Sequence, residues 1–260
     1  MVTYGGCVIT FNVVNDTARL VLKRADRCNA LTASMLEELK GALRQIESNH
    51  DIRVVLITAE GERFFSSGAD VNDWGRLSPH QMGLEWIRQG NRIFQRLSEL
   101  PVPVICGLQG LVLGGGAELA LAADFCIASE DVELGFPETG IGAIPGWMGC
   151  ARLVQSVGVA RARSLVLSGD LIDAKSLKGC GLVYEVVPVS KLDQAMEALA
   201  ERLCQRSRTA IAAAKQVFDA ISETTKFAPV HELAASVCRG SVDGQEGVNA
   251  FREKRAPRFE

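Results

Sequence analysis

Histidine is scarce in this sequence, and its placement excludes several kinds of active site. The only three histidines are His50, His80 and His231, and none lies at metal-ligand spacing from another histidine or from a cysteine. The eight cysteines are scattered, with no CxxC pair and no compact disulfide framework. We therefore expect no metal site, no histidine-based catalytic triad, and cysteines that are reduced residues of the core.

Long apolar runs, a basic excess and a leader segment are also lacking. The most apolar stretch, residues 110–123, is interrupted by Glu118 and three consecutive glycines and is shorter than the ~20 residues of a membrane-spanning helix. The N-terminal stretch MVTYGGCVITFNVV does not resemble a secretory signal. A formal net charge of -3 provides no basic surface for nucleic acid. The sequence predicts a soluble, cytoplasmic protein that binds neither membranes nor nucleic acid.

Strand-like and helix-like segments alternate through the first 190 residues. The expected strands are Cys7–Val13, Ala18–Leu22, Val54–Thr58, Val102–Leu108 and Phe125–Ala128, and the expected helices are Thr32–Ser48, Gly114–Ala123 and Gly146–Gln155. This alternation predicts an α/β fold with parallel strands and a site at their carboxyl ends. We expect the polar stretch Asp73–Trp86 to be an irregular, mobile loop.

The last part of the chain changes in character. Helical periodicity continues without strand runs, and the expected helices are Lys191–Gln205, Thr209–Glu223, Val230–Arg239 and Asp243–Lys254. We therefore divide the chain into a core at residues 1–190 and a helical region at residues 191–260.

Two glycine-rich loops follow apolar runs, and each is a candidate for presenting backbone N–H groups to a ligand. Their sequences are SSGAD at residues 66–70 and LGGGAE at residues 113–118. The second loop opens a helix, where unpaired N–H groups favour an oxyanion. Neither loop matches a dinucleotide or nucleoside-triphosphate signature, and on spacing alone each can equally be a tight turn.

Two glutamates lie among these glycines and apolar residues. Glu118 belongs to the first turn of the expected helix, where a carboxylate also complements the helix dipole. Glu138 follows Pro137 and can equally be a solvated loop residue. Two carboxylates in such surroundings are also what general acid-base chemistry on one substrate needs.

Three motifs, in their order and spacing, carry a family resemblance. The segments FFSSGAD, GLVLGGGAELALAADF and LGFPETGIGAIPG resemble those of the crotonase, or enoyl-CoA hydratase/isomerase, superfamily, and the resemblance runs through the whole chain. It implies a spiral of ββα repeats and a C-terminal helical region that forms a homo-oligomer, a trimer or a dimer of trimers. It also implies an acyl-CoA substrate and no further cofactor.

The resemblance implies roles for particular residues. The N–H groups of Ala69 and Gly115 match the family's oxyanion donors, and Glu118 and Glu138 match the two glutamates that hold water in its hydratases. Further positions matching the acyl-CoA site are Ser67, Gly68, Asp70, Val71, Gly114, Pro137 and Gly146.

Some positions depart from the family's pattern or allow two interpretations. The family's Pro-Lys pair is replaced by Ala25-Asp26, so we expect Arg24 or Arg27 to contact CoA instead. Trp147 either narrows the acyl pocket or packs under the following helix. Phe251 and Lys254 match positions that approach CoA, but they also suit an amphipathic helix.

The resulting hypothesis is a 2-enoyl-CoA hydratase, since both glutamates are present and hydration needs a base for water and a proton donor for Cα. The first alternative is an enoyl-CoA isomerase or another reaction through the same enolate, such as hydrolysis or retro-Claisen cleavage. A non-catalytic acyl-CoA-binding protein is a second alternative. A serine hydrolase using Ser66 or Ser67 is weaker, because no histidine lies in a motif that would pair with them.

Overall fold

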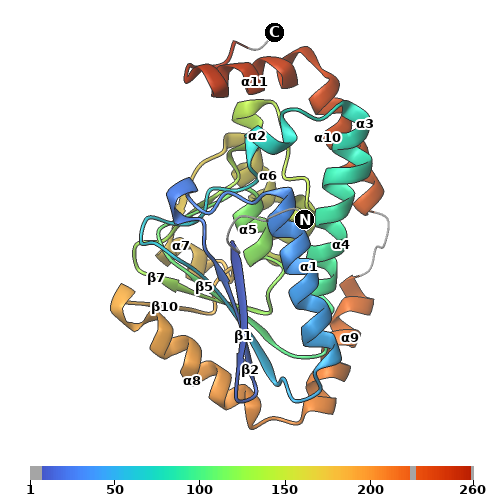
Figure 1. Ribbon diagram of the computed structural model, residues 1–260. Coiled ribbons are helices and arrows are strands. Elements are labelled where there is room, and N and C mark those ends of the chain that lie inside the picture. Colours follow the sequence, from blue (N-terminus) through green and yellow to red (C-terminus); the bar gives the residue numbers. More distant parts are fainter. Residues whose placement is uncertain (1–7, 223–226, 259–260) are drawn as a thin grey trace.

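The computed structural model describes residues 8–222 and 227–258, which form two β-sheets enclosed by helices (Figure 1). The six-stranded sheet has the order β1-β2-β3-β5-β7-β10, and the four-stranded sheet has the order β4-β6-β8-β9. The strands of the large sheet are β1 (Ile9–Val14), β2 (Thr17–Leu22), β3 (Val54–Ala59), β5 (Val104–Leu108), β7 (Phe125–Ser129) and β10 (Glu185–Val187). The strands of the small sheet are β4 (Phe64–Ser66), β6 (Leu111–Leu113), β8 (Glu133–Gly135) and β9 (Ile172–Asp173).

Three successive strand pairs generate a spiral. In the pairs β3–β4, β5–β6 and β7–β8, the first strand joins the large sheet and the second joins the small sheet. A helical segment follows each pair: α2 (Val71–Trp74), α5 (Gly115–Ala120) and η3 (Pro137–Ile141). Because β4, β6 and β8 are adjacent and parallel, their carboxyl ends meet at one edge. The expected α/β fold with repeated ββα units is confirmed.

Helices cover both faces of the large sheet, which explains the continuous apolar runs of its central strands. One face packs against α8 (Leu192–Cys204) and the other joins the main core. The α8 side is formed by Val54, Leu56, Ile105, Ile127 and Val187 from the sheet and by Leu192, Met196, Leu199 and Ala200 from the helix. The first helix of the C-terminal region is therefore part of the packing of the sheet.

The helix expected at Thr32–Ser48 forms as α1 (Ala33–Ser48). The Thr32 hydroxyl accepts a hydrogen bond from the Met35 N–H at 3.2 Å and so satisfies one of the free donors at the helix start. Its buried face consists of Met35, Leu36, Leu39, Ala42, Leu43 and Ile46, the positions that the 3.6-residue period predicts.

The remaining C-terminal helices are α9 (Arg208–Ser222), α10 (Phe227–Gly240) and α11 (Val242–Glu253). They begin and end within three residues of the expected bounds, and Glu223 lies outside the described residues. Figure 1 shows α11 across one end of the molecule, above α2, while α10 runs beside α4 (Arg88–Ser98). An ion pair between the buried Lys215 of α9 and Asp124, 2.5 Å from nitrogen to oxygen, attaches the helical region to the core.

The expected loop at Asp73–Trp86 is wrong, because this stretch is largely helical. It contains the end of α2, then α3 (Pro79–Gln81) and the π-helix η2 (Met82–Ile87), which continues into α4. Ser78 and Gln81 form a reciprocal capping box at the start of α3. Trp74, Met82 and Trp86 are buried, so apolar packing orders a segment that reads as polar.

Other bounds differ from those expected. The helix expected at Gly146–Gln155 is α6 (Gly149–Ser168), which starts only after a left-handed residue at Met148. The short segments η1 (Ala25–Arg27), α7 (Ala174–Gly179) and η4 (Val189–Lys191) complete the fold. Within residues 8–222 and 227–258, no helix has both the length and the apolar character needed to cross a bilayer.

Candidate active site

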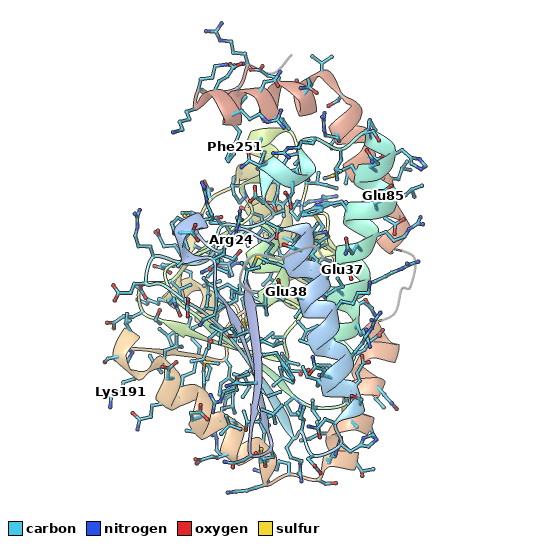
Figure 2. The ribbon with its side chains drawn as sticks, in the orientation of Figure 1. Arg24, Glu37, Glu38, Glu85, Lys191 and Phe251 are labelled. Carbon is cyan, nitrogen blue, oxygen red and sulfur yellow. The ribbon has the colours of Figure 1, made fainter. Side chains whose placement is uncertain are left out.

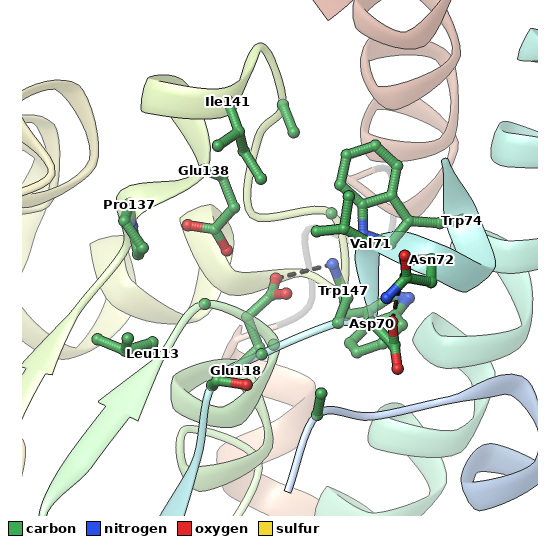
Figure 3. Close-up of a pocket in the computed structure, with 18 of the residues that line it drawn as sticks. Asp70, Val71, Asn72, Trp74, Leu113, Glu118, Pro137, Glu138, Ile141 and Trp147 are labelled. Carbon is green, nitrogen blue, oxygen red and sulfur yellow. Dashed lines mark hydrogen bonds between the residues drawn. The ribbon is translucent and has the colours of Figure 1, made fainter. Parts of the chain in front are cut away.

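A cavity of about 590 Å³ lies where the loops after β4, β6 and β8 meet. Figure 3 shows Glu118 and Glu138 on the same side of this cavity, with Val71 and Trp74 across from them. The spiral therefore brings together residues from all three motifs, because each motif follows one of three adjacent parallel strands.

The first candidate oxyanion donor is Ala69. The Leu31 N–H donates to the Gly68 carbonyl at 2.8 Å, and the Asp70 N–H donates to the Leu31 carbonyl at 2.8 Å. These two bonds flank Ala69 in a parallel bridge, so the N–H of Ala69 itself points to the opposite side, away from Leu31. Gly68 has φ +97, a conformation that favours glycine and turns the chain into this bridge.

The second candidate donor, Gly115, is the first residue of α5. Its N–H has no partner within the helix, as for every residue in a first helical turn. A Cβ on Gly115 would lie 3.1 Å from the Ala69 nitrogen, so the two loops are in close contact. Gly114 has φ 47 and ψ -120, and a Cβ there would lie 2.7 Å from the Glu138 Oε1. The two loops thus place two backbone donors side by side, next to a carboxyl group.

The Glu118 carboxylate is buried and fixed by backbone donors. Its Oε1 accepts hydrogen bonds from the N–H groups of Trp147 and Gly149, both at 2.7 Å. Met148 between them is left-handed at φ 66, and this turn aims both N–H groups at the same oxygen. A Cβ on Gly149 would lie 2.5 Å from that oxygen, so this position requires glycine. This cradle was not predicted from the sequence, in which Gly149 is the only local signal for it.

Glu138 lies in η3 and differs in its surroundings. Its Oε2 is buried and has no hydrogen-bond partner among the described residues. Burial raises the pKa of Glu138, and the neighbouring charge of Glu118 raises it further. Burial also raises the pKa of Glu118, while the N–H groups of Gly149 and Trp147 and the charge of Arg152 act against that rise. Two buried carboxyls that repel each other favour a state in which they share one proton.

Most of the other expected site residues line the cavity. These are Arg27, Ser67, Gly68, Asp70, Val71, Gly114, Pro137, Gly146, Trp147 and Phe251. Phe251 reaches it from the side of α11 that faces the rest of the chain (Figure 2).

Arg24 and Lys254 are not brought to the cavity. An Nη1 nitrogen of Arg24 donates to the Asp70 carboxylate at 2.7 Å and to the Ala30 carbonyl at 2.9 Å. Arg24 therefore braces the loop that carries Ala69, and of the two arginines only Arg27 lines the cavity. Lys254 ends α11 in a left-handed conformation, outside the cavity lining.

The apolar side of the cavity was largely missed from the sequence. It includes Met82, Trp86 and Ile87 of the π-helix, together with Ile141 and Ile144. The spacing of Met82, Trp86 and Ile87 is the helical signal that could have identified this wall.

Metal-ligating side chains do not gather in the described part of the chain: it contains no group of three or more His, Cys, Asp or Glu residues able to hold a metal ion. The seven cysteines it includes are free thiols, among them Cys28 at the cavity. The cavity lining includes the two candidate backbone donors and the two glutamates.

The chain is similar to known proteins in both sequence and fold. The family model for enoyl-CoA hydratase/isomerase matches residues 14–260. The protein named "Putative enoyl-CoA hydratase/isomerase YngF", from Bacillus subtilis (strain 168), is 37% identical over 254 residues, covering 96% of this chain and 97% of that protein. The short-chain-enoyl-CoA hydratase of Clostridium acetobutylicum is 32% identical over 241 residues, covering 92% of each chain.

A solved structure is similar over nearly the same span. The crystal structure of an enoyl-CoA hydratase from Bacillus anthracis aligns with a TM-score of 0.79 and 34% sequence identity, covering 97% of this chain and 99% of that chain. The family match, the relatives and the fold all lead to one assignment: this chain belongs to the enoyl-CoA hydratase/isomerase family.

Proposed function

We propose that this protein is an enoyl-CoA hydratase, which adds water reversibly to a 2-enoyl-CoA to give a 3-hydroxyacyl-CoA. One observation carries the proposal: two adjacent backbone loops and two buried carboxyl groups converge on one cavity. Relatives named as hydratases, at 31% to 37% identity over most of the chain, support the same reaction.

In this mechanism the thioester oxygen accepts hydrogen bonds from the N–H groups of Ala69 and Gly115. These donors stabilise the negative charge that develops on that oxygen as the enolate forms. Because they belong to the backbone of two fixed loops, they need little reorganisation during the reaction.

The two carboxyl groups supply the proton transfers. The oxygen of water bonds to Cβ and one of its protons goes to a carboxylate, while Cα receives a proton from the carboxyl pair. The raised pKa of each glutamate keeps a proton available near neutral pH. The two groups act as a coupled pair, so neither is assigned as the only base.

These four groups provide the charge stabilisation and the proton transfers that hydration requires. The proposal therefore includes no metal or redox cofactor, and CoA enters only as part of the substrate. Arg27, at the cavity, is the cation placed to contact CoA phosphates.

The assembly and cellular setting are further parts of the proposal. Exposed apolar side chains on α9 and α10, such as Val217, Leu233 and Val237, support a homo-oligomer, and we favour a trimer or a dimer of trimers in which residues 191–260 mediate contact. We place the reaction in cytoplasmic fatty acid β-oxidation. Sedimentation as a species near 28.0 kDa at micromolar concentration would overturn the oligomer.

The direct test is the absorbance of the conjugated double bond. Mixing the protein with a trans-2-enoyl-CoA should bleach that absorbance and produce a 3-hydroxyacyl-CoA. If the protein instead interconverts 3-enoyl and 2-enoyl thioesters without adding water, it is an isomerase. Binding of CoA thioesters without turnover would identify a non-catalytic binding protein.

A further inference from the structure

The indole of Trp147 lies directly beside the candidate oxyanion hole. It is 1% exposed, and its Cζ3 would lie 2.7 Å from a Cβ placed on Gly115. The same residue donates the backbone N–H that holds Glu118. The ring therefore stands at the reacting end of the cavity, and its position is tied to that of a candidate catalytic carboxylate.

A notch in α4 receives the other edge of the ring. A Cβ on Gly90 would lie 2.2 Å from the Trp147 Nε1, so only glycine leaves room for the indole there. The ring centroids of Trp86 and Phe94 lie 5.3 Å and 5.2 Å from that of Trp147. Contacts on several sides hold the indole in place, and it forms a fixed wall rather than a movable side chain.

The polarity of the cavity shows which end receives the acyl group. Asp26 and Arg27 are charged and largely exposed residues of the cavity lining, beside which a charged and hydrated CoA moiety can lie. Trp86 and Ile87 line the side of the cavity next to Trp147. A Cβ added to Gly146 would lie 2.5 Å from the Cδ1 of Ile87, so Ile87 packs closely against the residue before Trp147. A thioester bound at the backbone donors with its CoA toward Arg27 therefore directs its acyl chain toward the apolar wall.

We propose that Trp147, seated in the Gly90 notch, determines the acyl-chain specificity of this enzyme and restricts it to short, uncharged acyl groups. The proposal rests on the proposed hydratase function, whose substrate class it narrows. A chain that extends past Cβ toward α4 meets the indole, because the ring fills the space between Gly115 and Gly90.

The charges along the cavity explain why the acyl group should be uncharged. Its charged lining residues in the described chain are Asp26, Arg27, Asp70, Glu118 and Glu138, so Arg27 is the one cation, at the end assigned to CoA. A carboxylate at the far end of an acyl group would be buried among aromatic and aliphatic side chains without a partner, which is costly.

The test compares trans-2-enoyl-CoA substrates of four, six, eight and ten carbons. For the unmodified protein, kcat/KM should fall at least about tenfold between the four-carbon and eight-carbon substrates, since misfit of even one methylene in an apolar pocket costs about that much. In Trp147→Ala the ratio of eight-carbon to four-carbon kcat/KM should rise at least about tenfold. A six-carbon substrate ending in a carboxylate should remain poor in both proteins.

Two further variants separate specificity from loosened packing. Trp147→Leu keeps an apolar side chain and should give a smaller shift in the same direction, which remains measurable if Trp147→Ala fails to fold. Phe94→Leu is the matched control, because Phe94 packs on the indole but does not line the cavity. An unchanged ratio in both Trp147 variants, or an equal shift in Phe94→Leu, would overturn the proposal.

Binding of saturated thioesters decides the proposal without relying on turnover. Calorimetry should show that octanoyl-CoA binds the unmodified protein at least about tenfold more weakly than butyryl-CoA, and that a Trp147 variant removes this difference. If no enoyl-CoA is hydrated but this binding pattern is found, the hydratase function fails while the role of Trp147 stands. Equal binding of the two thioesters to the unmodified protein would refute that role.

Discussion

The two glutamates face the same cavity but differ in the hydrogen bonds that their carboxyl groups accept. Around the start of α6, the N–H groups of Trp147 and Gly149 donate to one oxygen of Glu118. In η3, the Oε2 of Glu138 is buried and has no hydrogen-bond partner among the described residues. The N–H groups around the start of α6 thus oppose the rise that burial causes in the pKa of Glu118, whereas the charge of Glu118 adds to the rise that burial causes in the pKa of Glu138.

Under the proposed mechanism, two carboxyl groups in unlike surroundings carry out acid and base chemistry without a histidine. Backbone donors lower the cost of charge on Glu118, and burial beside another carboxyl increases that cost on Glu138. Unlike surroundings are the usual way in which paired carboxyls take separate roles.

The largest effect is expected from removing either titrating group. Glu118→Gln and Glu138→Gln should each lower kcat for hydration by roughly 10² to 10⁴, the usual contribution of a positioned acid or base. In Glu118→Gln the amide oxygen can still accept the N–H bonds of Trp147 and Gly149, so the loss reports on proton transfer rather than geometry. Stopped-flow absorbance with a four-carbon enoyl-CoA measures both variants.

The double variant, which carries both Glu118→Gln and Glu138→Gln, tests whether the two carboxyl groups act on one water molecule. Its loss in kcat should be much smaller than the product of the single losses, because residues that work as a unit are not additive. Butyryl-CoA affinity, measured by calorimetry, serves as the control for an intact site. Near-normal turnover in either single variant would remove that glutamate from the mechanism.

A smaller effect should come from disturbing the cradle of Glu118 without touching the carboxylate. In Gly149→Ala the new methyl group would lie 2.5 Å from the Glu118 Oε1, so the carboxylate must move. A displacement of this kind can lower kcat by roughly 10²-fold. Gly140→Ala is the matched control on the Glu138 side, since a Cβ there meets nothing within 4 Å. Equal activity in the two alanine variants would mean that the cradle does not position Glu118.

Much of this architecture could be predicted from local sequence patterns. The buried face of α1 follows from its period, and the central strands follow from continuous apolar runs that need cover on both faces. The two glycine-rich loops could be identified because glycine is needed where φ is positive or where two backbones touch, as at Gly68 and Gly114. Both glutamates could be identified as carboxylates among glycines and apolar residues.

Other features depend on contacts between distant residues. The strands β4, β6 and β8 have three residues each, too few for an alternating pattern, yet their adjacency brings the three loops together. The bonds from Trp147 and Gly149 to Glu118 connect residues about thirty positions apart. The ion pair between Arg24 and Asp70 joins residues that are still farther apart in the sequence, and it holds the Arg24 side chain outside the cavity lining. Periodicity carries no information about such pairings.

The smallest expected effect is on the pH dependence of stability, and it distinguishes the two environments directly. The folded-state pKa of Glu138 is raised above its ordinary value of 4.5, so the folded protein binds more protons than the unfolded chain over the pH range between the two values. The stability that this group contributes is fully present below its unfolded pKa and is lost as the pH rises through its folded pKa, which lies at about 8. Glu138→Gln cannot lose that proton, so its free energy of unfolding relative to the unmodified protein should increase from pH 5 to pH 8, by roughly 1 to 3 kcal/mol. The increase should be smaller in Glu118→Gln, because two N–H groups stabilise the ionised form of Glu118. Urea unfolding at both pH values, at one protein concentration, measures these differences. If the stability of Glu138→Gln relative to the unmodified protein stays constant between pH 5 and pH 8, folding does not raise the pKa of Glu138.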